Sequence, residues 1–414
     1  MKFEATVNIG MSALEPALKA AKKGAGAVAP SAKEPELGLN SVSPGYPPRR
    51  ALLVDVFAGA GGLSQGFLDA GFQLAASVES NTYAAATQRH NHGQRDYPPD
   101  IIDEPVEHIP VDRLLASCGR FGALRPDVLV GGPPCQGFSR SNMQTRTLDN
   151  PLNHLFRYFL NLVSKLDPRA VVLENVADLT RFDGGSIADE IVLALKQMPR
   201  KYSVERELLC AADFGVPQTR NRVFFVAFER GLRFDFGMLE KRTPVTLWQA
   251  ISDLPDLENG NTVDELPYAQ PPQNAYQHAM REHAGLKVTN CLVSRNGELV
   301  RKRYRHIRQG ENWESIPDEL MSNYADKSRT HHWIYLRLKQ HDPSVTITHF
   351  RKSMLIHPLQ DRGLSVREAA RIQSFRDDFT FCGPLMHQQQ QVANAVPPLM
   401  AQAVATALRR TLAF

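Results

Sequence analysis

Apolar residues along the chain gather in short runs that alternate with amphipathic stretches. The runs lie at residues 51–57, 73–79, 127–131, 170–175, 203–209 and 222–228, and each has the length of one strand. The stretches between them, such as 61–71 and 153–166, repeat their apolar positions at helical spacing. Strands that are apolar on both faces and alternate with helices predict an α/β fold with a mainly parallel sheet and helices on both faces.

This alternation stops near residue 230. From there to about residue 345, Pro, Gly, Asn and charged residues dominate, which predicts a second, irregular domain. Helical spacing returns at 364–375 and 390–412. Residues 11–50 are rich in Ala, Lys, Pro and Ser and predict a flexible leader, so the folded chain is expected to begin near Ala51.

The composition is that of an ordinary globular protein, with 43% hydrophobic and 22% charged residues. A net charge of +4 permits a polyanionic partner without establishing one. No apolar run approaches the roughly 18 residues of a membrane-spanning helix, and "MKFEATVNIG" lacks the pattern of a secretory signal. We therefore expect no membrane association and a cytoplasmic location.

The cysteines are scattered and odd in number, and no two of them form a C-x-x-C pair. They are Cys118, Cys135, Cys210, Cys291 and Cys382. This pattern argues against a disulfide framework or a structural zinc site, and it favours a reducing compartment.

The stretch "DVFAGAGGLSQGF", from Asp55 to Phe67, joins an expected strand to an expected helix through small residues. Small residues let a ligand approach the backbone, and a helix N-terminus offers free N–H groups. Ligands of open α/β sheets bind at the carboxyl ends of strands, where an acid such as Glu79 commonly accepts hydrogen bonds from ribose hydroxyls. A turn without a ligand and an ordinary surface glutamate are the alternatives.

Cys135 lies in "GGPPCQGFSR", directly after an expected strand. Pro133 and Pro134 fix the φ angles before it and hold this loop in one shape. Rigid placement of a reactive atom suits a nucleophile. Most free cysteines are simply buried, so these residues alone support a nucleophilic and a structural Cys135 about equally.

Two further strands carry polar residues at one end. Glu174 and Asn175 end "VVLEN", where an acid and an amide can hydrogen-bond the edge of a heterocycle. In "QTRNR", Arg220 and Arg222 alternate with polar neighbours, which predicts that both point to one face. Two adjacent guanidinium groups suit a phosphate or a carbonyl oxygen. A polar strand end and a solvated strand entry are the alternatives.

The motifs "DVFAGAGGLSQGF", "GGPPCQGFS", "LENV", "QTRNR" and "QVANAVPP" follow one another in an order that resembles the successive signatures of cytosine-C5 DNA methyltransferases. "LSVREAARIQSF" resembles that family's penultimate motif, and the resemblance covers residues 51–228 and 345–408. It implies a Rossmann-like class I methyltransferase domain, with a mixed, mostly parallel sheet and helices on both faces, and a small irregular target-recognition domain. The implied bounds are a leader at 1–50, a catalytic domain at 51–235 to which 385–414 returns, and a recognition domain at 236–384.

The resemblance implies S-adenosylmethionine as the methyl donor, S-adenosylhomocysteine as the product, and no metal. The residues implied at the cofactor site are Phe57, Ala58, Gly59, Gly61, Leu63, Glu79, Asp103, Pro133, Asn394, Ala395 and Val396. Glu79 would bind the ribose, whereas the acid for the adenine amino group stays open between Asp100, Asp103 and Glu104. The chain departs from the family at Ala393, where Gly is frequent, and at "NPLNHL" (150–155), which lacks an acid and an arginine.

The implied chemistry gives each polar residue a task. Cys135 would attack C6 of a cytosine, which makes C5 nucleophilic enough to accept a methyl group. Glu174 would hold the N3 edge of the base, and Arg222 would contact its carbonyl with Arg220 nearby. These four residues are the expected catalytic group.

A cytosine within a duplex must be flipped out before it can react in this way. The segment after the cysteine would close over the flipped base, with Ser139 and Arg140 touching the DNA backbone. In the irregular region, the basic stretch 295–310 would contact phosphates through residues such as Arg303 and Arg305. A solvated charged face is the alternative for this stretch.

Double-stranded DNA is therefore the expected partner of a monomeric prokaryotic enzyme located at the nucleoid. A cognate restriction or phage-defence system is a plausible further partner. A tRNA methyltransferase of the same fold and an inactive DNA-binding regulator are the alternatives. The irregular domain with its basic stretch favours duplex DNA, and the intact Cys135, Glu174 and Arg222 argue against an inactive site.

Overall fold

The computed structural model describes residues 50–134, 155–324, 333–352 and 354–414. All of them belong to one unit of mutually contacting residues, which spans 47–414. The expected division at 235/236 therefore stays a prediction, and the expected leader lies outside the described residues apart from Arg50. No helix in the described ranges is long and apolar enough to cross a membrane.

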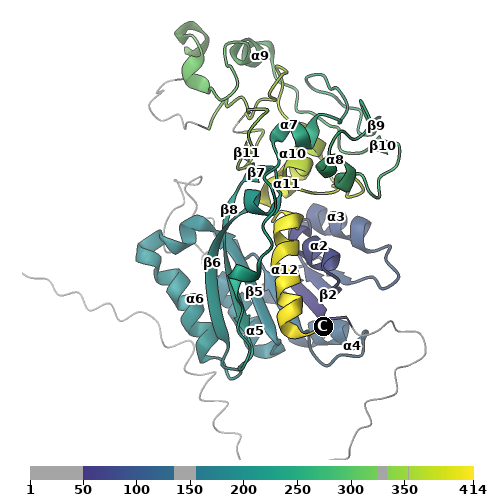
Figure 1. The fold of residues 1–414 in the computed structure, drawn as a ribbon, viewed down its shortest axis with the longest axis vertical. Coiled ribbons are helices and arrows are strands. Elements are labelled where there is room, and N and C mark those ends of the chain that lie inside the picture. Colours follow the sequence, from purple (N-terminus) through teal and green to yellow (C-terminus); the bar gives the residue numbers. More distant parts are fainter. Residues whose placement is uncertain (1–49, 135–154, 325–332, 353) are drawn as a thin grey trace, which may run out of the picture. The chain divides into compact units, whose positions relative to one another are not determined.

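A seven-stranded sheet forms the centre of the fold, with the order β3-β2-β1-β4-β5-β8-β6 (Figure 1). Its strands are β1 (Leu52–Val56), β2 (Gln73–Val78), β3 (Asp100–Ile102), β4 (Val128–Gly131), β5 (Ala170–Val176), β6 (Ser203–Cys210) and β8 (Asn221–Phe228). Neighbours from β3 to β5 are parallel, and β8 runs antiparallel to both β5 and β6. The predicted mixed, mostly parallel sheet is confirmed. Only β3 was not predicted, because its three residues are too few to show a period.

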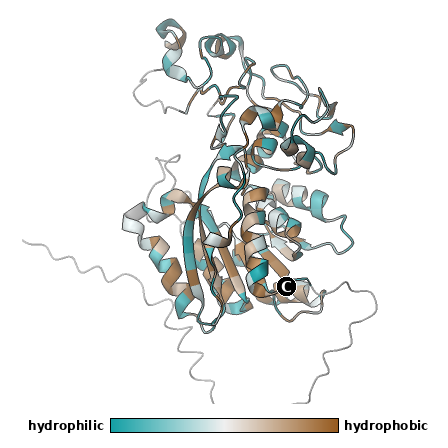
Figure 2. Ribbon diagram, viewed as in Figure 1, coloured by the Kyte–Doolittle hydropathy of each residue, from teal (hydrophilic) through white to brown (hydrophobic). Residues whose placement is uncertain are grey.

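Helices cover both faces of this sheet. They are α2 (Gly62–Asp69), α3 (Thr82–His92), α4 (Val111–Gly119), α5 (Leu155–Leu166), α6 (Ser186–Gln197) and α12 (Pro398–Leu412). One hydrophobic core joins the sheet to α4, α5 and α6, and the other joins it to α2 and α12. Alternate residues of β1 enter different cores, Leu52 and Val54 the first and Leu53 the second, as strand geometry requires. Figure 2 shows the apolar colouring along several of these strands.

The region after β8 contains short elements, as its composition predicted. They are α7 (Leu247–Ile251), α8 (Ala275–Met280), α9 (Glu298–Tyr304), α10 (Val366–Ile372), α11 (Leu385–Asn394), an antiparallel pair β9 (Leu266–Pro267) and β10 (Lys287–Val288), and β11 (Ser344–Val345), which pairs parallel with β7 (Gln218–Thr219). The 3₁₀ turns of the described chain are Val106–His108, Ala177–Thr180, Phe182–Gly185, Ala211–Phe214, Phe236–Met238, Trp313–Ser315 and Asp318–Met321.

The helical pattern predicted at 364–375 is present as α10. The pattern predicted at 390–412 is interrupted, because α11 ends at Asn394 and α12 begins at Pro398. Pro397 and Pro398 have no N–H to continue α11, and the residue before a proline disfavours helical geometry. Pro398 is tolerated as the first residue of α12, where no N–H is needed.

The C-terminal helix α12 packs directly on α2 (Figure 1). The contact is close because α2 carries Gly66 at this point. A Cβ at residue 66 would lie 2.5 Å from both the Ala401 Cβ and the Pro398 carbonyl oxygen. Helices α2 and α12 thus share one interface, and Val396, just before α12, lies against Gly62 at the carboxyl end of β1.

Gly66→Ala is expected to destabilise the protein by roughly 1–3 kcal/mol, because overpacking a helix contact costs more than Ala gains in helix propensity. The matched control is Gly119→Ala at the end of α4, where an added Cβ meets nothing within 4 Å. That control should be neutral or slightly stabilising. Urea unfolding of both variants checks this, and equal stability of the two would contradict the packing described.

Candidate active site

The chain leaves β1 through a turn that uses left-handed backbone three times. Phe57, Gly59 and Gly61 have φ angles of 59°, 57° and 90°. A Cβ at Gly61 would lie 3.0 Å from His92 Nε2, so that position lacks both the space and the conformation for a side chain. A Cβ at Gly59 would meet nothing within 4 Å, so the backbone here borders open space that a ligand can enter.

Glu79 follows β2 and faces this turn. Its Oε2 accepts a hydrogen bond from the Gly59 N–H at 2.8 Å, and its Oε1 accepts one from the Asn81 N–H at 2.7 Å. Burial raises the pKa of the Glu79 carboxyl, and these two N–H groups oppose the rise. The predicted ribose acid and the small-residue turn are therefore joined directly.

Of the three acids left open for the adenine, Asp103 lies beside Glu79. The Glu79 N–H donates to the Ile102 carbonyl at 3.0 Å, so Asp103 directly follows the paired residue. Its Oδ1 is buried with no partner among the described residues, while Oδ2 lies 3.4 Å from Arg89 Nη1. Asp100 and Glu104 both lie within 4 Å of the Arg113 guanidinium, so the geometry favours Asp103.

The C-terminal residues predicted at the cofactor site meet the same turn. A Cβ at Gly62 would lie 2.3 Å from the Val396 carbonyl oxygen, which places Val396 against the start of α2. Asn394 ends α11 with its side chain exposed, and its Oδ1 accepts a hydrogen bond from Gln390 Nε2 at 2.7 Å. Leu63 is buried in the core between α2 and α12.

Asp55, within β1 and two residues before this turn, is not among the residues predicted from the sequence. It is fully buried, its Oδ2 accepts a hydrogen bond from the Ser64 hydroxyl, and its Oδ1 has no partner among the described residues. Burial raises the pKa of this carboxyl to about 7. The available signal was a lone acid inside an apolar strand, since carboxylates are rarely buried without a partner.

Glu174 and Arg222 form an ion pair at the carboxyl end of β5. Arg222 Nε lies 2.9 Å from Glu174 Oε1, and the two side chains are only 14% and 10% exposed. They meet because β8 runs antiparallel to β5, with Val176 opposite Arg222. Burial raises the pKa of the Glu174 carboxyl, and the charges of Arg222 and Arg220 oppose the rise.

The start of the cysteine loop is held against this pair. A Cβ at Gly132 would lie 3.1 Å from Glu174 Oε2, and the Asn175 side-chain amide donates to the Pro133 carbonyl at 3.0 Å. The structure thus brings Glu174, Arg222 and Pro133 together. Cys135 lies outside the described residues, as do Ser139 and Arg140.

Arg220 lies close to Glu174 but its guanidinium is engaged elsewhere. It is buried and donates to the carbonyl oxygens of Ile347 at 3.0 Å and Ala393 at 3.1 Å. Arg220 falls between β7 and β8, so it does not continue the strand alternation that the sequence suggested. Its contacts connect the start of β8 to the C-terminal segments.

Of the two arginines expected to bind phosphates, one is exposed and the other is buried. Arg305 is exposed, 3.7 Å from Glu298 and 3.9 Å from Asp361. Arg303 is buried and donates to the Leu320 carbonyl, the Tyr335 hydroxyl and Asn323, so it is not presented to a phosphate here. The expectation for Arg303 is wrong because α9 buries one side, which carries Arg303 and Tyr304. Lys302 and Arg308 are exposed alternatives.

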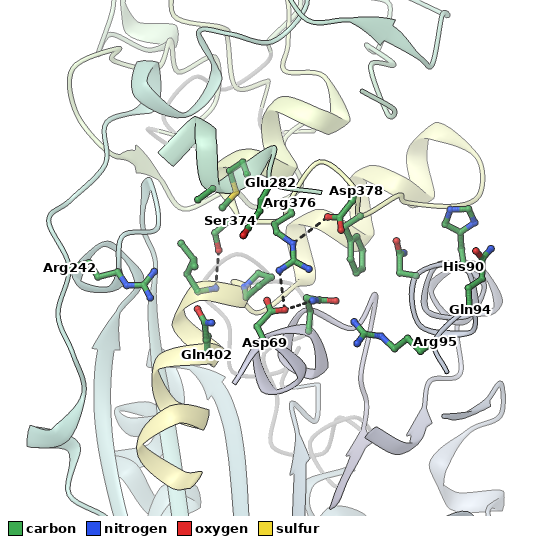
Figure 3. A pocket seen from close by; sticks show the side chains of 17 residues that line it. Asp69, His90, Gln94, Arg95, Arg242, Glu282, Ser374, Arg376, Asp378 and Gln402 are labelled. Carbon is green, nitrogen blue, oxygen red and sulfur yellow. Dashed lines mark hydrogen bonds and ion pairs between the residues drawn. The ribbon is translucent and has the colours of Figure 1, made fainter. Parts of the chain in front are cut away.

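A separate polar cavity has a volume of about 480 Å³. Figure 3 shows the side chains that line it, which come mainly from α2, the end of α3, the end of α8, the segment after α10 and the start of α12. Arg376 is paired there with Asp69 at 3.1 Å and Asp378 at 3.4 Å. Within the described part of the chain, none of the predicted catalytic or cofactor residues lines it. We therefore assign this cavity no part in the reaction.

The fold is Rossmann-like, and it is shared with solved methyltransferases. A solved E. coli protein described as a prophage-encoded DNA modification methyltransferase matches 88% of this chain and 99% of its own, with a TM-score of 0.71 and 24% identity. The Entamoeba histolytica methyltransferase EhMeth matches the same shares with a TM-score of 0.57 and 14% identity. At these identities the likeness concerns the fold alone.

The sequence comparisons identify the family. The family model for C-5 cytosine-specific DNA methylase matches residues 52–410. The type II methyltransferase M1.HphI of Haemophilus parahaemolyticus is 33% identical over 356 residues, covering 86% of each chain, and M.DdeI of Desulfomicrobium norvegicum is 31% identical over 375 residues. The chain belongs to the C-5 cytosine-specific DNA methylase family, and it is a DNA (cytosine-5-)-methyltransferase.

Asp55 is expected to make the folded protein less stable as the pH rises. Its folded pKa of about 7 exceeds the ordinary 3.8, so the stabilising contribution is fully present below about pH 4 and is lost as the pH rises to about 7. The loss is at most about 1.4 kcal/mol per pH unit. Urea unfolding of wild type and Asp55→Asn should show a stability difference that shifts in favour of the variant across this range. A difference independent of pH would contradict the assignment.

Proposed function

We propose that this enzyme methylates C5 of a cytosine flipped out of duplex DNA, through a covalent bond between the Cys135 sulfur and C6. The observation that carries the proposal is the nearly buried Glu174–Arg222 pair, which lies against Gly132 at the start of the cysteine loop, while the adjacent Asn175 holds Pro133. An acid and a guanidinium beside the start of this loop support a site in which a nucleophile and a base meet.

The turn after β1 fits S-adenosylmethionine, the cofactor that the family implies. Open space above Gly59 admits a ligand, and the half-buried Glu79 and Asp103 offer oxygens to ribose and adenine. Val396 would close the site beside Gly62. When bound, the cofactor supplies a methyl group on a positively charged sulfur, ready for transfer to a carbon nucleophile.

The protein's task is to make C5 of cytosine nucleophilic. Attack by the Cys135 thiolate forms a C6–S bond and pushes electron density towards C5. Glu174 would share a proton with N3, for which its raised pKa is suited, and Arg222 would donate to the base carbonyl. After C5 has gained the methyl group, the C5 proton leaves and the C6–S bond breaks, which restores both the aromatic ring and the thiolate.

Base flipping follows from the geometry of this attack. A thiolate must approach C6 from the face of the ring, and that face is covered by the neighbouring bases in a duplex. Extrusion costs about a few kcal/mol, which contacts to the DNA must offset. The exposed Lys302, Arg305 and Arg308 on and after α9 are suited to supply phosphate contacts.

We further infer a role in restriction–modification. The support is the description of the relatives M1.HphI and M.DdeI as type II methyltransferases, each similar over most of its length. A cognate endonuclease would then cut the same sequence that this enzyme methylates. Bisulfite sequencing of DNA from cells that express the protein would identify that sequence.

Cys135→Ser should abolish methylation and leave S-adenosylmethionine binding nearly unchanged, because a hydroxyl is far less nucleophilic than a thiolate at neutral pH. Wild type should also form a complex stable to denaturation with a duplex that carries 5-fluorocytosine at the target, since fluorine blocks the final elimination. The variant should form none. Methylation by the variant, or no adduct with wild type on DNA it otherwise methylates, would remove the covalent step.

The double substitution of Arg305 and Arg308 by Ala should weaken binding to all duplexes about equally and leave the methylated sequence unchanged. Each lost phosphate contact should flatten the slope of log affinity against log salt by roughly 0.9. The matched control is the double substitution of Arg230 and Arg233 by Ala. These two residues follow β8, whose last residue pairs with the first residue of β5, so they lie away from the carboxyl ends of the parallel strands. An unchanged slope would show a merely solvated face, and a changed target sequence would show base reading.

A further inference from the structure

Both backbone polar groups of Gly59 are held by buried or half-buried side chains. Its N–H donates to Glu79 Oε2 at 2.8 Å, and its carbonyl oxygen accepts from Gln88 Nε2 at 2.7 Å. Gln88 lies on α3 and is fully buried. Gly59, which has left-handed backbone and borders open space, is thus held by hydrogen bonds at both its N–H and its carbonyl group.

The orientation of the Gln88 amide is determined by its two neighbours. The Gly59 carbonyl can only accept a hydrogen bond, so the amide nitrogen must face it. The amide oxygen faces β2, where it accepts from the Ser77 hydroxyl at 2.5 Å. Ser77 is also fully buried, so bulk water does not compete for the amide oxygen of Gln88.

The hydrogen bonds form a closed ring around the turn. Glu79 Oε1 accepts from the Asn81 N–H, and Asn81 caps α3 by accepting from the N–H groups of Tyr83 and Ala84. α3 then carries Gln88 back to Gly59. A change at Gln88 therefore affects the shape of the turn and the position of the Glu79 carboxylate together.

The next turn of α3 supports the same loop by packing. His92 lies four residues after Gln88, on the same face of the helix, and its Nε2 is 3.0 Å from where a Gly61 Cβ would be. Burial and the nearby Arg95 charge lower the pKa of His92 to about 3, so the ring is neutral at physiological pH. α3 thus contacts the turn with one polar and one neutral aromatic group.

We infer that Gln88 is a positioning residue for the cofactor. Resting on the S-adenosylmethionine site proposed above, it holds Gly59 in the left-handed conformation that aims the Glu79 carboxylate at the ribose. Gln88 is buried beneath the turn and acts through Gly59, without touching the reacting atoms. A glutamine that merely stabilises the fold would lower stability without a selective effect on cofactor binding.

The test is Gln88→Met, which keeps the side-chain length and removes both hydrogen bonds. S-adenosylmethionine and S-adenosylhomocysteine affinities are measured by calorimetry, beside thermal unfolding and steady-state kinetics. We expect binding of both to weaken by roughly 5- to 50-fold, since two buried hydrogen bonds are lost. KM for S-adenosylmethionine should rise correspondingly, while kcat at saturating cofactor should stay within about threefold and DNA affinity should not change.

The matched control is Gln277→Met on α8. Gln277 is equally buried and also makes one donated and one accepted hydrogen bond, to Ser252 Oγ and from the Gln273 N–H. It should lose similar stability and keep cofactor affinity within about twofold. A similar loss of affinity in this control would show a general effect of instability and would overturn the inference.

Ser77→Ala keeps the inference testable if Gln88→Met does not fold. It frees the Gln88 amide to rotate, so cofactor binding should weaken in the same direction by roughly 2- to 10-fold. Affinity within twofold of wild type for a folded Gln88→Met, or for Ser77→Ala where the former does not fold, would overturn the inference. Glu79→Ala distinguishes a failure of the Gln88 inference from a failure of the proposed ribose site. If Glu79→Ala weakens cofactor binding and Gln88→Met does not, only the role of Gln88 is wrong. If Glu79→Ala leaves cofactor binding unchanged, the ribose assignment itself is wrong.

Discussion

The five residues between β1 and α2 impose the constraint on which the site depends. The chain must leave the middle of a parallel sheet and enter a helix at once, and it does so with left-handed backbone at Phe57, Gly59 and Gly61. Such a turn persists only where its surroundings over-determine it. Glu79 and Gln88 supply the polar contacts, and α3 supplies the packing. Because its backbone is held by these contacts, the turn keeps its shape and the space above Gly59 stays open.

The second region of the site lies at the carboxyl end of β5, where two charged side chains form an ion pair. Glu174 and Arg222 are nearly buried, and the cost of removing both from water is offset by their contact at 2.9 Å. Burial and the arginine charges act on the Glu174 pKa in opposite directions. The acid is therefore sensitive to what binds beside it, because a neutral base that enters would change its solvation and its hydrogen bonds simultaneously.

The end of the chain completes both regions. α12 lies on α2 through Gly66, Val396 meets Gly62, and Arg220 donates to the Ala393 carbonyl next to α11. Further along, the fully buried Arg371 of α10 pairs with Asp253 and Asp377 and so connects α10 to the segment after α7. Apart from Arg371–Asp377, these contacts join residues more than a hundred positions apart, and they explain why the segments on either side of the irregular region form one unit.

The sequence by itself determined the strand and helix alternation, the mixed sheet and the family, because short-range periodicity and the order of motifs are local properties of the chain. It also indicated Glu79 and Glu174, since strand ends in such sheets gather at one edge. Only the tertiary structure decided that Arg303 faces inward and Arg305 outward, and that Arg220 binds backbone carbonyls. It also decided that Gln88 binds Gly59 in the turn after β1 and that Asp55 binds Ser64 of α2. Those facts depend on which surfaces pack together over long sequence separations. The type of a residue and its spacing from its sequence neighbours do not determine which distant residue it contacts.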